Sequence, residues 1–281
     1  MVAGYKSPIP LTISLTKGVH GPNFANSIII THLLDGMKSP FTFQRRTFPS
    51  WDITVVLSFL RDKCEPLDKI SLRLLTFKTV FLIAMATARR ISGIHAISGL
   101  DKDIAFDDNY SVDLNFLPEF RAKNQKSMVL SKPFSITSIS NILNDDDADN
   151  LLCPVRALRQ YLRSTSSFRQ GKRRLFVSIR PQYKKDISKS TISRWIKTII
   201  ILAYDHHSSH LGNLNVKAHE LRAISSSLSA MLGTPVEAIM RSAYWSAQTT
   251  FLNYYIWDIQ HLCRDGHLSF APAVFAGQSE K

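Results

Sequence analysis

The sequence predicts a mostly helical protein with a small antiparallel β-sheet insert, and three observations lead to this fold class. Apolar residues recur at helical spacing along several stretches, whereas alternation of apolar and polar residues is confined to a short region after residue 101. A length of 281 residues with 44% hydrophobic and 10% aromatic residues is sufficient for a large packed core. The 20% of charged residues, 11 Gly and 12 Pro exclude a disordered, collagen-like or low-complexity chain.

The first fifty residues differ in composition from the rest of the chain. They are rich in Pro, Ser and Thr, and their one apolar run is Ile28–Leu34. The stretch Lys38–Ser50 has the composition of a linker. We therefore expect residues 1–47 to hold a partial helical domain plus linker, residues 48–265 to form the main domain, and residues 266–281 to be a tail.

The first part of the main domain is predicted to be helical. Asp52 stands at the start of a helix that has apolar residues on one face as far as Leu60, and an acid at this end suits the helix dipole. A second helical region begins at Pro66 and is apolar on nearly all sides, which predicts a central position in the core. A third helix is expected over Arg90–Ile97.

The pattern changes to β-type after residue 101. Ser111–Phe116 alternates between polar and apolar residues, Ser127–Leu130 is a second short β-type run, and Pro118–Lys126 joins them as a turn segment. This arrangement predicts a β-hairpin. Beyond it we expect one short strand, at Leu175–Ser178. We also expect further helices at Pro154–Arg163, Ser188–Tyr204, His219–Leu232, Pro235–Arg241 and Ala247–Ile259.

The charge of the chain is concentrated in one segment. The net charge is +13 and the pI is about 9.8, and residues 151–200 alone contain thirteen Lys and Arg against one acid, Asp186. Apolar residues at regular spacing in the same segment indicate that this charge lies on folded structure. Such a charge indicates an acidic partner, with nucleic acid as the first candidate and a membrane surface as the second. The candidate DNA-binding residues are Arg156, Arg159, Arg163, Lys172, Arg173, Arg174, Lys184, Lys185, Lys189, Arg194 and Lys197.

Two short segments combine groups that bind phosphate. His219 and Arg222 lie three residues apart at a predicted helix start and therefore share one face. A guanidinium offers a planar fork to two oxygens, and an imidazole can donate or move a proton. Upstream, Arg89 and Arg90 follow the apolar helix. The pair either marks the point where that helix reaches the surface or carries a rigidly held Arg into a cleft.

A third segment, after Trp245, ends in the adjacent tyrosines Tyr254 and Tyr255. Adjacent residues on a helix point about 100° apart, so one of the two rings is able to face a cleft. The three segments together resemble the boxes of the tyrosine recombinase (phage-integrase) family, most closely the recombinases of DIRS-type and Crypton-like retroelements. The resemblance covers roughly Trp51–Ile259. The three segments contain four boxes in the family's order and spacing, which are Ala86–Ile94, His219–Arg222, Trp245, and Tyr254 or Tyr255.

The resemblance implies a role for each matching residue. Tyr255 is the expected nucleophile, with Tyr254 as the alternative, and Lys123 is the expected general acid, with Lys126 second. The sequence departs from the family pattern at Gly93, where an acid is usual, and at Arg89, where a neutral residue is usual. The remaining expected catalytic residues are Arg90 and Arg222 on the phosphate oxygens, His219 in proton transfer and Trp245 against the phosphate.

The resemblance also implies an activity and partners. It implies a site-specific recombinase that cuts and rejoins double-stranded DNA through a 3′-phosphotyrosine intermediate, without a metal or a small-molecule cofactor. The alternative is a catalytically decayed, DNA-binding remnant of a mobile element. The family further implies a dimer or tetramer on DNA, no membrane association and a nuclear location, and residues 1–47 would be the last part of a helical core-binding domain.

Metal and disulfide chemistry are not favoured by the sequence. The acids within Asp145–Asp149 have no Gly-centred calcium spacing, and the run is expected to be a solvated loop. His206, His207 and His210 lack partners at zinc-site spacing. Three scattered cysteines indicate reduced thiols, and we find neither an apolar run long enough for a membrane span nor a signal peptide.

Overall fold

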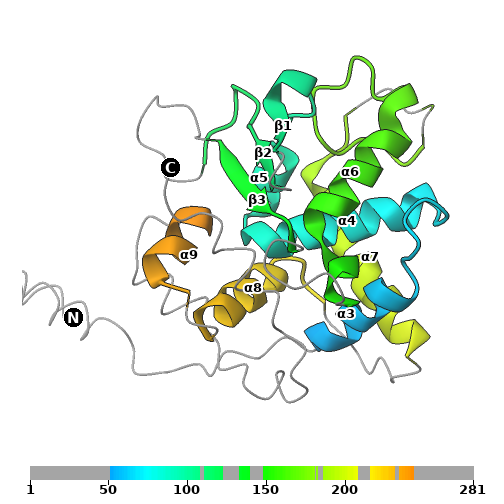
Figure 1. Cartoon of the computed structure of the whole chain (residues 1–281), viewed down its shortest axis with the longest axis vertical. Coiled ribbons are helices and arrows are strands. Elements are labelled where there is room, and N and C mark those ends of the chain that lie inside the picture. Colours follow the sequence, from blue (N-terminus) through cyan, green and yellow to red (C-terminus); the bar gives the residue numbers. More distant parts are fainter. Residues whose placement is uncertain are drawn as a thin grey trace, which may run out of the picture. The chain divides into compact units, whose positions relative to one another are not determined.

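The computed structural model describes residues 51–107, 111–122, 133–139, 148–180, 182, 186–207, 216–231 and 234–243 (Figure 1). A division of the chain into two units falls between Phe48 and Pro49, so every described residue belongs to the second unit. The elements in chain order are α3 (Ile53–Asp62), α4 (Leu72–Thr87), α5 (Ile91–His95), β1 (Ile104–Phe106), β2 (Ser111–Leu114), β3 (Phe134–Thr137), α6 (Pro154–Thr165), α7 (Lys189–His206), α8 (Glu220–Met231) and α9 (Val236–Ala243).

Helix α4 forms the centre of the core. Every residue from Leu75 to Thr87 is buried, and the helix packs against α6, α7 and α8, which surround it in Figure 1. The predicted central position is therefore confirmed. The helix begins at Leu72 and not at Pro66, because the Ser71 hydroxyl caps it by accepting the Leu74 backbone N–H at 3.3 Å.

The other long helices also begin where their sequences predict. The Asp52 carboxylate caps α3 by accepting the Thr54 backbone N–H at 2.8 Å. Pro154 occupies the first turn of α6, where its missing N–H costs nothing. Ser188 caps α7 by accepting the Thr191 N–H at 3.2 Å. Among the helices of the described ranges, none is long and apolar enough to cross a membrane.

The sheet insert is a three-stranded antiparallel sheet in the order β1–β2–β3. Strand β2 confirms the predicted strand that starts at Ser111, and its residue Leu114 pairs with Ile104 on one side and Phe134 on the other. Strands β1 and β3 were not predicted, because three or four residues carry too little alternation to identify a strand. The predicted strand Ser127–Leu130 lies outside the described residues.

The prediction of a strand over Leu175–Ser178 is wrong. This segment meets the chain after α5 through a single bridge between Ser98 and Arg174, with Leu175 N–H donating to the Ile97 carbonyl at 2.9 Å. Leu175 to Val177 are buried, so their apolar run reflects burial and not strand pairing. The close approach requires Gly99, where a Cβ atom would lie 2.3 Å from the Arg174 carbonyl oxygen.

Candidate phosphate-binding site

The first wall of the candidate site is built by the end of α4. Ala88 follows the helix in the left-handed conformation (φ 46°, ψ 27°) and ends it. Arg90 then serves as the N-cap residue of the short helix α5, with its carbonyl accepting the Gly93 N–H at 2.8 Å. The two arginines are thus held on a tight connection between two helices, and the predicted helix Arg90–Ile97 is reduced to the five residues of α5.

Helix α8 brings the second arginine segment to the same place. It packs on α4, and its Ser225 hydroxyl donates to the Met85 carbonyl in the last turns of that helix. Several small residues of the two helices are buried, among them Ala86, Ser226 and Ser229. Segments that are far apart in the sequence therefore meet on either side of one pocket.

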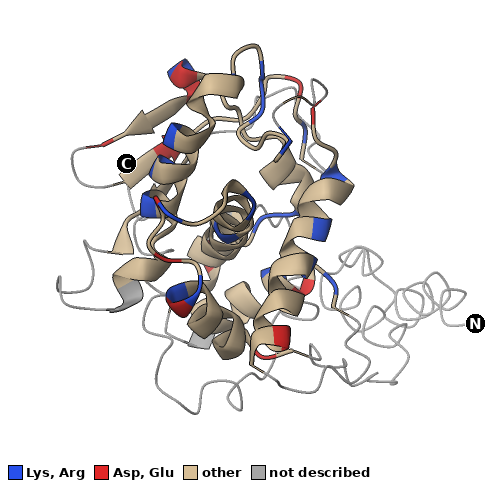
Figure 2. Ribbon diagram, turned by 90° about the vertical axis from the view of Figure 1, so that its right-hand side faces the viewer, with Lys and Arg blue, Asp and Glu red and all other residues tan. Residues whose placement is uncertain are grey.

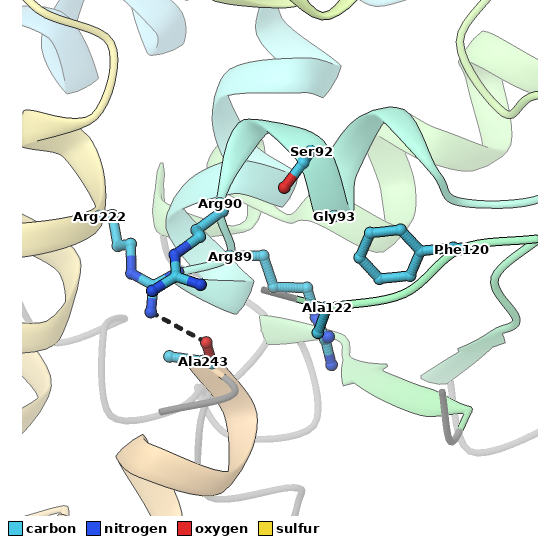
Figure 3. A pocket seen from close by; sticks show the side chains of 8 residues that line it. All are labelled: Arg89, Arg90, Ser92, Gly93, Phe120, Ala122, Arg222 and Ala243. Atoms are coloured by element: carbon cyan, nitrogen blue, oxygen red, sulfur yellow. Dashed lines mark hydrogen bonds between the residues drawn. The ribbon is translucent and has the colours of Figure 1, made fainter. Parts of the chain in front are cut away.

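Arg90 and Arg222 share this pocket, and Figure 3 shows their side chains reaching the same corner of it. The pocket encloses about 320 Å³, part of it open to solvent. Three of the described lining residues are arginines and none is acidic, so an anion is the ligand that fits it. The lining residues are Arg89, Arg90, Ser92, Gly93, Phe120, Ala122, Arg222 and Ala243.

Arg222 is fixed in its orientation. Its side chain is 5% exposed, and its Nη2 donates to the carbonyl oxygen of Ala243, the last residue of α9, at 3.0 Å (Figure 3). A guanidinium carries five N–H donors in a rigid fork, so this bond to a carbonyl orients the whole group. Helix α9 is therefore part of the support of the pocket, a role that the sequence pattern did not indicate.

Arg89, the residue at the unusual position, also lines the pocket. Its guanidinium carbon lies 3.9 Å from the ring centroid of Phe134 and 4.9 Å from that of Phe116, and its side chain is 6% exposed. Two cation–π contacts in a desolvated place stabilise this charge and tie the arginine connection to β3. The sequence alone gave no sign of this, because Phe134 lies in a strand that was not predicted.

Gly93 is the other position at which the sequence departs from the family pattern, and its lack of a side chain leaves room beside Arg89. A Cβ atom built at Gly93 would lie 3.7 Å from the Arg89 Cβ and 3.9 Å from Phe120 Cζ, which are ordinary contacts. The absence of an acid at this position is thus not imposed by crowding. It leaves the described lining with three positive groups and no negative one.

The other expected catalytic residues have different outcomes. His219 precedes α8, is exposed, and does not appear among the described residues that line the pocket. Lys123 and its alternative Lys126, Trp245, Tyr254 and Tyr255 lie outside the described residues. Ala122, the described residue next to Lys123 in the chain, does line the pocket.

The sequence did not indicate the contact between Glu220 and Trp51, which lies beside the predicted residues His219 and Arg222. The Trp51 indole N–H donates to Glu220 Oε2 at 3.0 Å across a long separation in the chain. The acid at the first position of α8 was visible in the sequence, but its partner was not, because no local pattern connects them.

The basic residues of α6 make contacts within the protein. Arg156 forms two hydrogen bonds with the Glu65 carboxylate, at 2.7 and 2.8 Å. The Arg159 guanidinium carbon lies 4.8 Å from the centroid of the Phe106 ring. Arg163, in the last turn, is exposed. Two of the three predicted DNA-binding residues of this helix therefore also have structural contacts.

Basic residues in the connection between α6 and α7 also make contacts within the protein. Arg173 pairs with Glu119 at 3.0 Å, where both side chains are largely exposed. Arg174 donates to the His95 carbonyl at 2.8 Å and approaches Asp186 at 3.5 Å. Lys172 is half-buried, and Lys184 and Lys185 lie outside the described residues.

Helix α7 presents its basic residues to solvent. Lys189, Arg194 and Lys197 are all exposed. The start of α7 adjoins the end of α5, since His95 Nε2 lies 2.9 Å from the Ile187 carbonyl oxygen. Figure 2 shows that Lys and Arg lie on several elements of the described chain.

The described part of the chain offers no group of three or more His, Cys, Asp or Glu that could hold a metal ion.

Comparison with known proteins identifies the fold. No family model matches the chain, and no curated protein is similar to it in sequence. The structure is similar to that of the XerH site-specific recombinase bound to its difH substrate in a pre-cleavage complex, with a TM-score of 0.50 and 12% identity. That match covers 78% of this chain, and the chain spans 54% of the XerH chain.

A second similar structure is that of the XerA recombinase, with a TM-score of 0.48 and 15% identity over 92% of this chain and 83% of the other. The similarity to XerH, with the mostly helical architecture and the three-stranded antiparallel sheet, shows that the chain has the fold of a tyrosine recombinase catalytic domain.

Proposed function

We propose that a chain with this fold is a site-specific DNA recombinase that cleaves and rejoins strands through a covalent tyrosine intermediate. The observation that carries the proposal is the meeting of Arg90 and Arg222, from distant segments, in one pocket without a described acid. Such a pair suits the non-bridging oxygens of a phosphodiester and the extra charge of its transition state. XerH, the similar structure, is a site-specific recombinase bound to a DNA substrate.

In the proposed reaction, the Tyr255 hydroxyl oxygen attacks the phosphorus of a DNA phosphodiester, and the bond from phosphorus to the 5′ oxygen breaks. The tyrosine proton leaves toward His219, and Lys123 donates a proton to the departing 5′ oxygen. Attack by the 5′-hydroxyl of another strand reverses these steps and joins the strands. The phosphodiester energy is kept in the phosphotyrosine bond, so no external energy source is required.

The test is the capture of the covalent intermediate. A pool of nicked duplexes with randomised sequence is incubated with the protein; cleavage near a nick releases a short fragment, so the protein stays on the 3′ phosphate. Adducts recovered after denaturation are sequenced, which also identifies the DNA site. We expect adducts with the wild type, none with Tyr255→Phe, and a loss of at least about tenfold with Arg222→Lys, which keeps the charge but not the fork.

Tyr254→Phe is the matched control, because it removes a hydroxyl from the adjacent residue. Adducts that persist in Tyr255→Phe and vanish in Tyr254→Phe would make Tyr254 the nucleophile. Salt-sensitive duplex binding without any wild-type adduct would instead support the alternative, a DNA-binding remnant that has lost the reaction.

The finer expectations stay predictions from the sequence resemblance. They are a mobile element of the DIRS or Crypton type as source, assembly as a dimer or tetramer on DNA, and a nuclear location. Sedimentation of the protein with and without its recovered DNA site measures the number of subunits, and a monomer on cleaved DNA would exclude the expected assembly.

A further inference from the structure

Glu220 closes the turn that carries His219. Its backbone N–H donates to the Lys217 carbonyl at 3.0 Å, and its carboxylate oxygen Oε2 accepts the Lys217 N–H at 3.1 Å. Residues 217 and 220 are therefore joined by two hydrogen bonds in opposite directions. The next bond, from Arg222 N–H to the His219 carbonyl at 3.2 Å, continues this turn into α8. The Glu220 side chain thus adds to the backbone bonds that hold the segment bearing His219 and Arg222.

The same carboxylate oxygen ties this turn to the start of the folded unit. Oε2 also accepts the indole N–H of Trp51 at 3.0 Å. One ionised oxygen that accepts two N–H donors forms stronger bonds than a neutral acceptor would. A carboxylate in the first turn of a helix is further favoured by the helix dipole.

Trp51 is itself held rigidly. Its side chain is 2% exposed, and the next residue, Asp52, donates its backbone N–H to the hydroxyl of Tyr204 on α7. Asp52 also caps α3 through its bond to Thr54. The indole therefore offers a fixed point at the junction of α3 and α7, against which Glu220 can orient the first turn of α8.

The guanidinium end of Arg222 is held by its hydrogen bond to the Ala243 carbonyl, as described above. The first turn of α8 is consequently set from two sides, by Trp51 through Glu220 and by α9 through the Arg222 fork. Neither Trp51 nor Glu220 lines the pocket within the described residues, so neither is placed to touch a phosphate there.

We propose that Glu220 is a positioning residue, which orients His219 and Arg222 for the reaction by bonding the indole of Trp51. The inference rests on the proposed function for its effect on the rate, but its structural part stands independently. Removal of the bond leaves the charges of the pocket intact and loosens the turn that aims them. Its effect should appear in the chemical step and not in DNA affinity.

The experiment compares Glu220→Ala, Glu220→Gln, Trp51→Phe and the double variant Trp51→Phe/Glu220→Ala. At saturating DNA we expect Glu220→Ala and Trp51→Phe each to lower the rate constant of adduct formation about tenfold, with Kd for duplex DNA within about twofold. The double variant should be no slower than Glu220→Ala, because both changes remove one interaction. Glu220→Gln should recover most of the rate, since its amide oxygen accepts the same two donors.

Glu237→Ala is the matched control. Glu237 is an exposed acid in the first turn of α9, so its removal changes the same charge at another helix start. Its rate should equal that of the wild type. Equal slowing in Glu237→Ala and Glu220→Ala would overturn the proposal, because net charge would then explain both.

Hydrogen exchange of the backbone amides of residues 217–222 gives a second readout that needs no activity. Faster exchange in Glu220→Ala and Trp51→Phe, confined to this turn, supports the positioning role even where the wild type forms no adduct. A wild type that forms no adduct would count against the proposed function alone. An unchanged rate and unchanged exchange in both variants overturns the positioning role. So does a parallel fall of Tm, DNA affinity and rate, which indicates a general structural role.

Discussion

Gly93 and Gly99 lie six residues apart and have opposite surroundings. At Gly93, in α5, a Cβ would make ordinary contacts, the nearest at 3.7 Å. At Gly99, a Cβ would lie 2.3 Å from the Arg174 carbonyl oxygen and 2.9 Å from the Leu175 nitrogen, both backbone atoms that cannot turn away. Replacing Gly93 by alanine therefore tests the conformational freedom of glycine, and replacing Gly99 tests the lack of space for a side chain.

We predict that Gly93→Ala stabilises the protein by about 0.5–1 kcal/mol, because alanine loses less conformational freedom in a helix than glycine does. Gly99→Ala should lower the free energy of unfolding by about 2 kcal/mol or more, because the backbone contact at Arg174 must open. Urea unfolding of both variants measures the two effects. A destabilised Gly93→Ala would show that α5 does not tolerate a side chain at this position.

At the same scale, the sequence predicted Arg90 and Arg222 because both belong to boxes with recognisable neighbours. It did not predict that Arg89 lines the pocket or that Trp51 bonds Glu220. Both depend on residues that meet only in the folded chain: Arg89 lies over rings from the sheet region, and Trp51 lies far from Glu220 in sequence. Local patterns carry no information on such pairs.

At the scale of elements, α4 contains a buried cation that links it to α6. Lys78 is fully buried, and its Nζ bonds the Leu60 carbonyl at 3.0 Å, the Cys64 carbonyl at 3.1 Å and the Glu65 carboxylate at 2.5 Å. Glu65 in turn pairs with Arg156 at the start of α6. One carboxylate therefore connects the central helix, the segment that follows α3, and α6.

The pKa values of this cluster follow from burial and charge. Burial lowers the pKa of Lys78 from its ordinary 10.5, and the carboxylate of Glu65 opposes that shift. Burial by itself would raise the pKa of Glu65, but hydrogen bonds from Arg156 and Lys78 together outweigh it and lower the pKa below the ordinary 4.5. The ionised Glu65 therefore adds stability above pH 4.5 or so, and that stability is lost as the pH falls through its folded-state pKa.

Glu65→Gln should cost about 3–5 kcal/mol of unfolding free energy at neutral pH, because it leaves the Lys78 charge buried without its carboxylate. Part of the acid dependence of stability should disappear with it. Arg156→Gln is the control and should cost only about 1 kcal/mol, because its side chain is 41% exposed. Equal losses in the two variants, measured by urea unfolding between pH 3 and 7, would contradict the central role of Lys78.

The helices were predictable because α4 is a long apolar run, and because α6 and α7 combine apolar periodicity with residues that favour a helix start, Pro154 in the first turn and Ser188 as a cap. The sheet was predictable only in part, since β1 has three residues and β3 has four. The segment after Arg174 misled the prediction because its apolar run is buried by neighbouring elements and makes no ladder. Short elements are defined by their partners and not by their own sequence.

At the scale of the whole molecule, the basic charge is divided between residues with protein partners and residues that face solvent. Arg156 and Arg159 on α6 contact Glu65 and Phe106, whereas Lys189 and Lys197 on α7 are exposed. Counterion release on DNA binding depends on charges that can reach phosphates. The sequence indicates the amount of basic charge. Only the fold shows which basic residues have contacts within the protein and which face solvent.

We predict that Lys189→Gln/Lys197→Gln reduces the slope of log K against log salt for duplex binding by roughly two, at about 0.9 for each phosphate contact. The matched pair Arg156→Gln/Arg159→Gln should change the slope by less than one, because those guanidinium groups have contacts within the protein. Titrations from low to moderate salt measure both. A larger change from the α6 pair would place the DNA on that side of the molecule.

The pocket has one further consequence, which concerns the synthesis of the protein. Its lining comes from the connection before α5 and from α5 itself, from the segment after β2, and from α8 and α9, so it combines segments that are distant in the sequence. Contacts between segments so distant in sequence require the closure of long loops, which costs conformational entropy. A nascent chain that has released α4 and α5 from the ribosome already contains Arg90 but has no second arginine beside it. The pocket therefore gains its Arg222 and Ala243 walls only after α8 and α9 have been synthesised and docked.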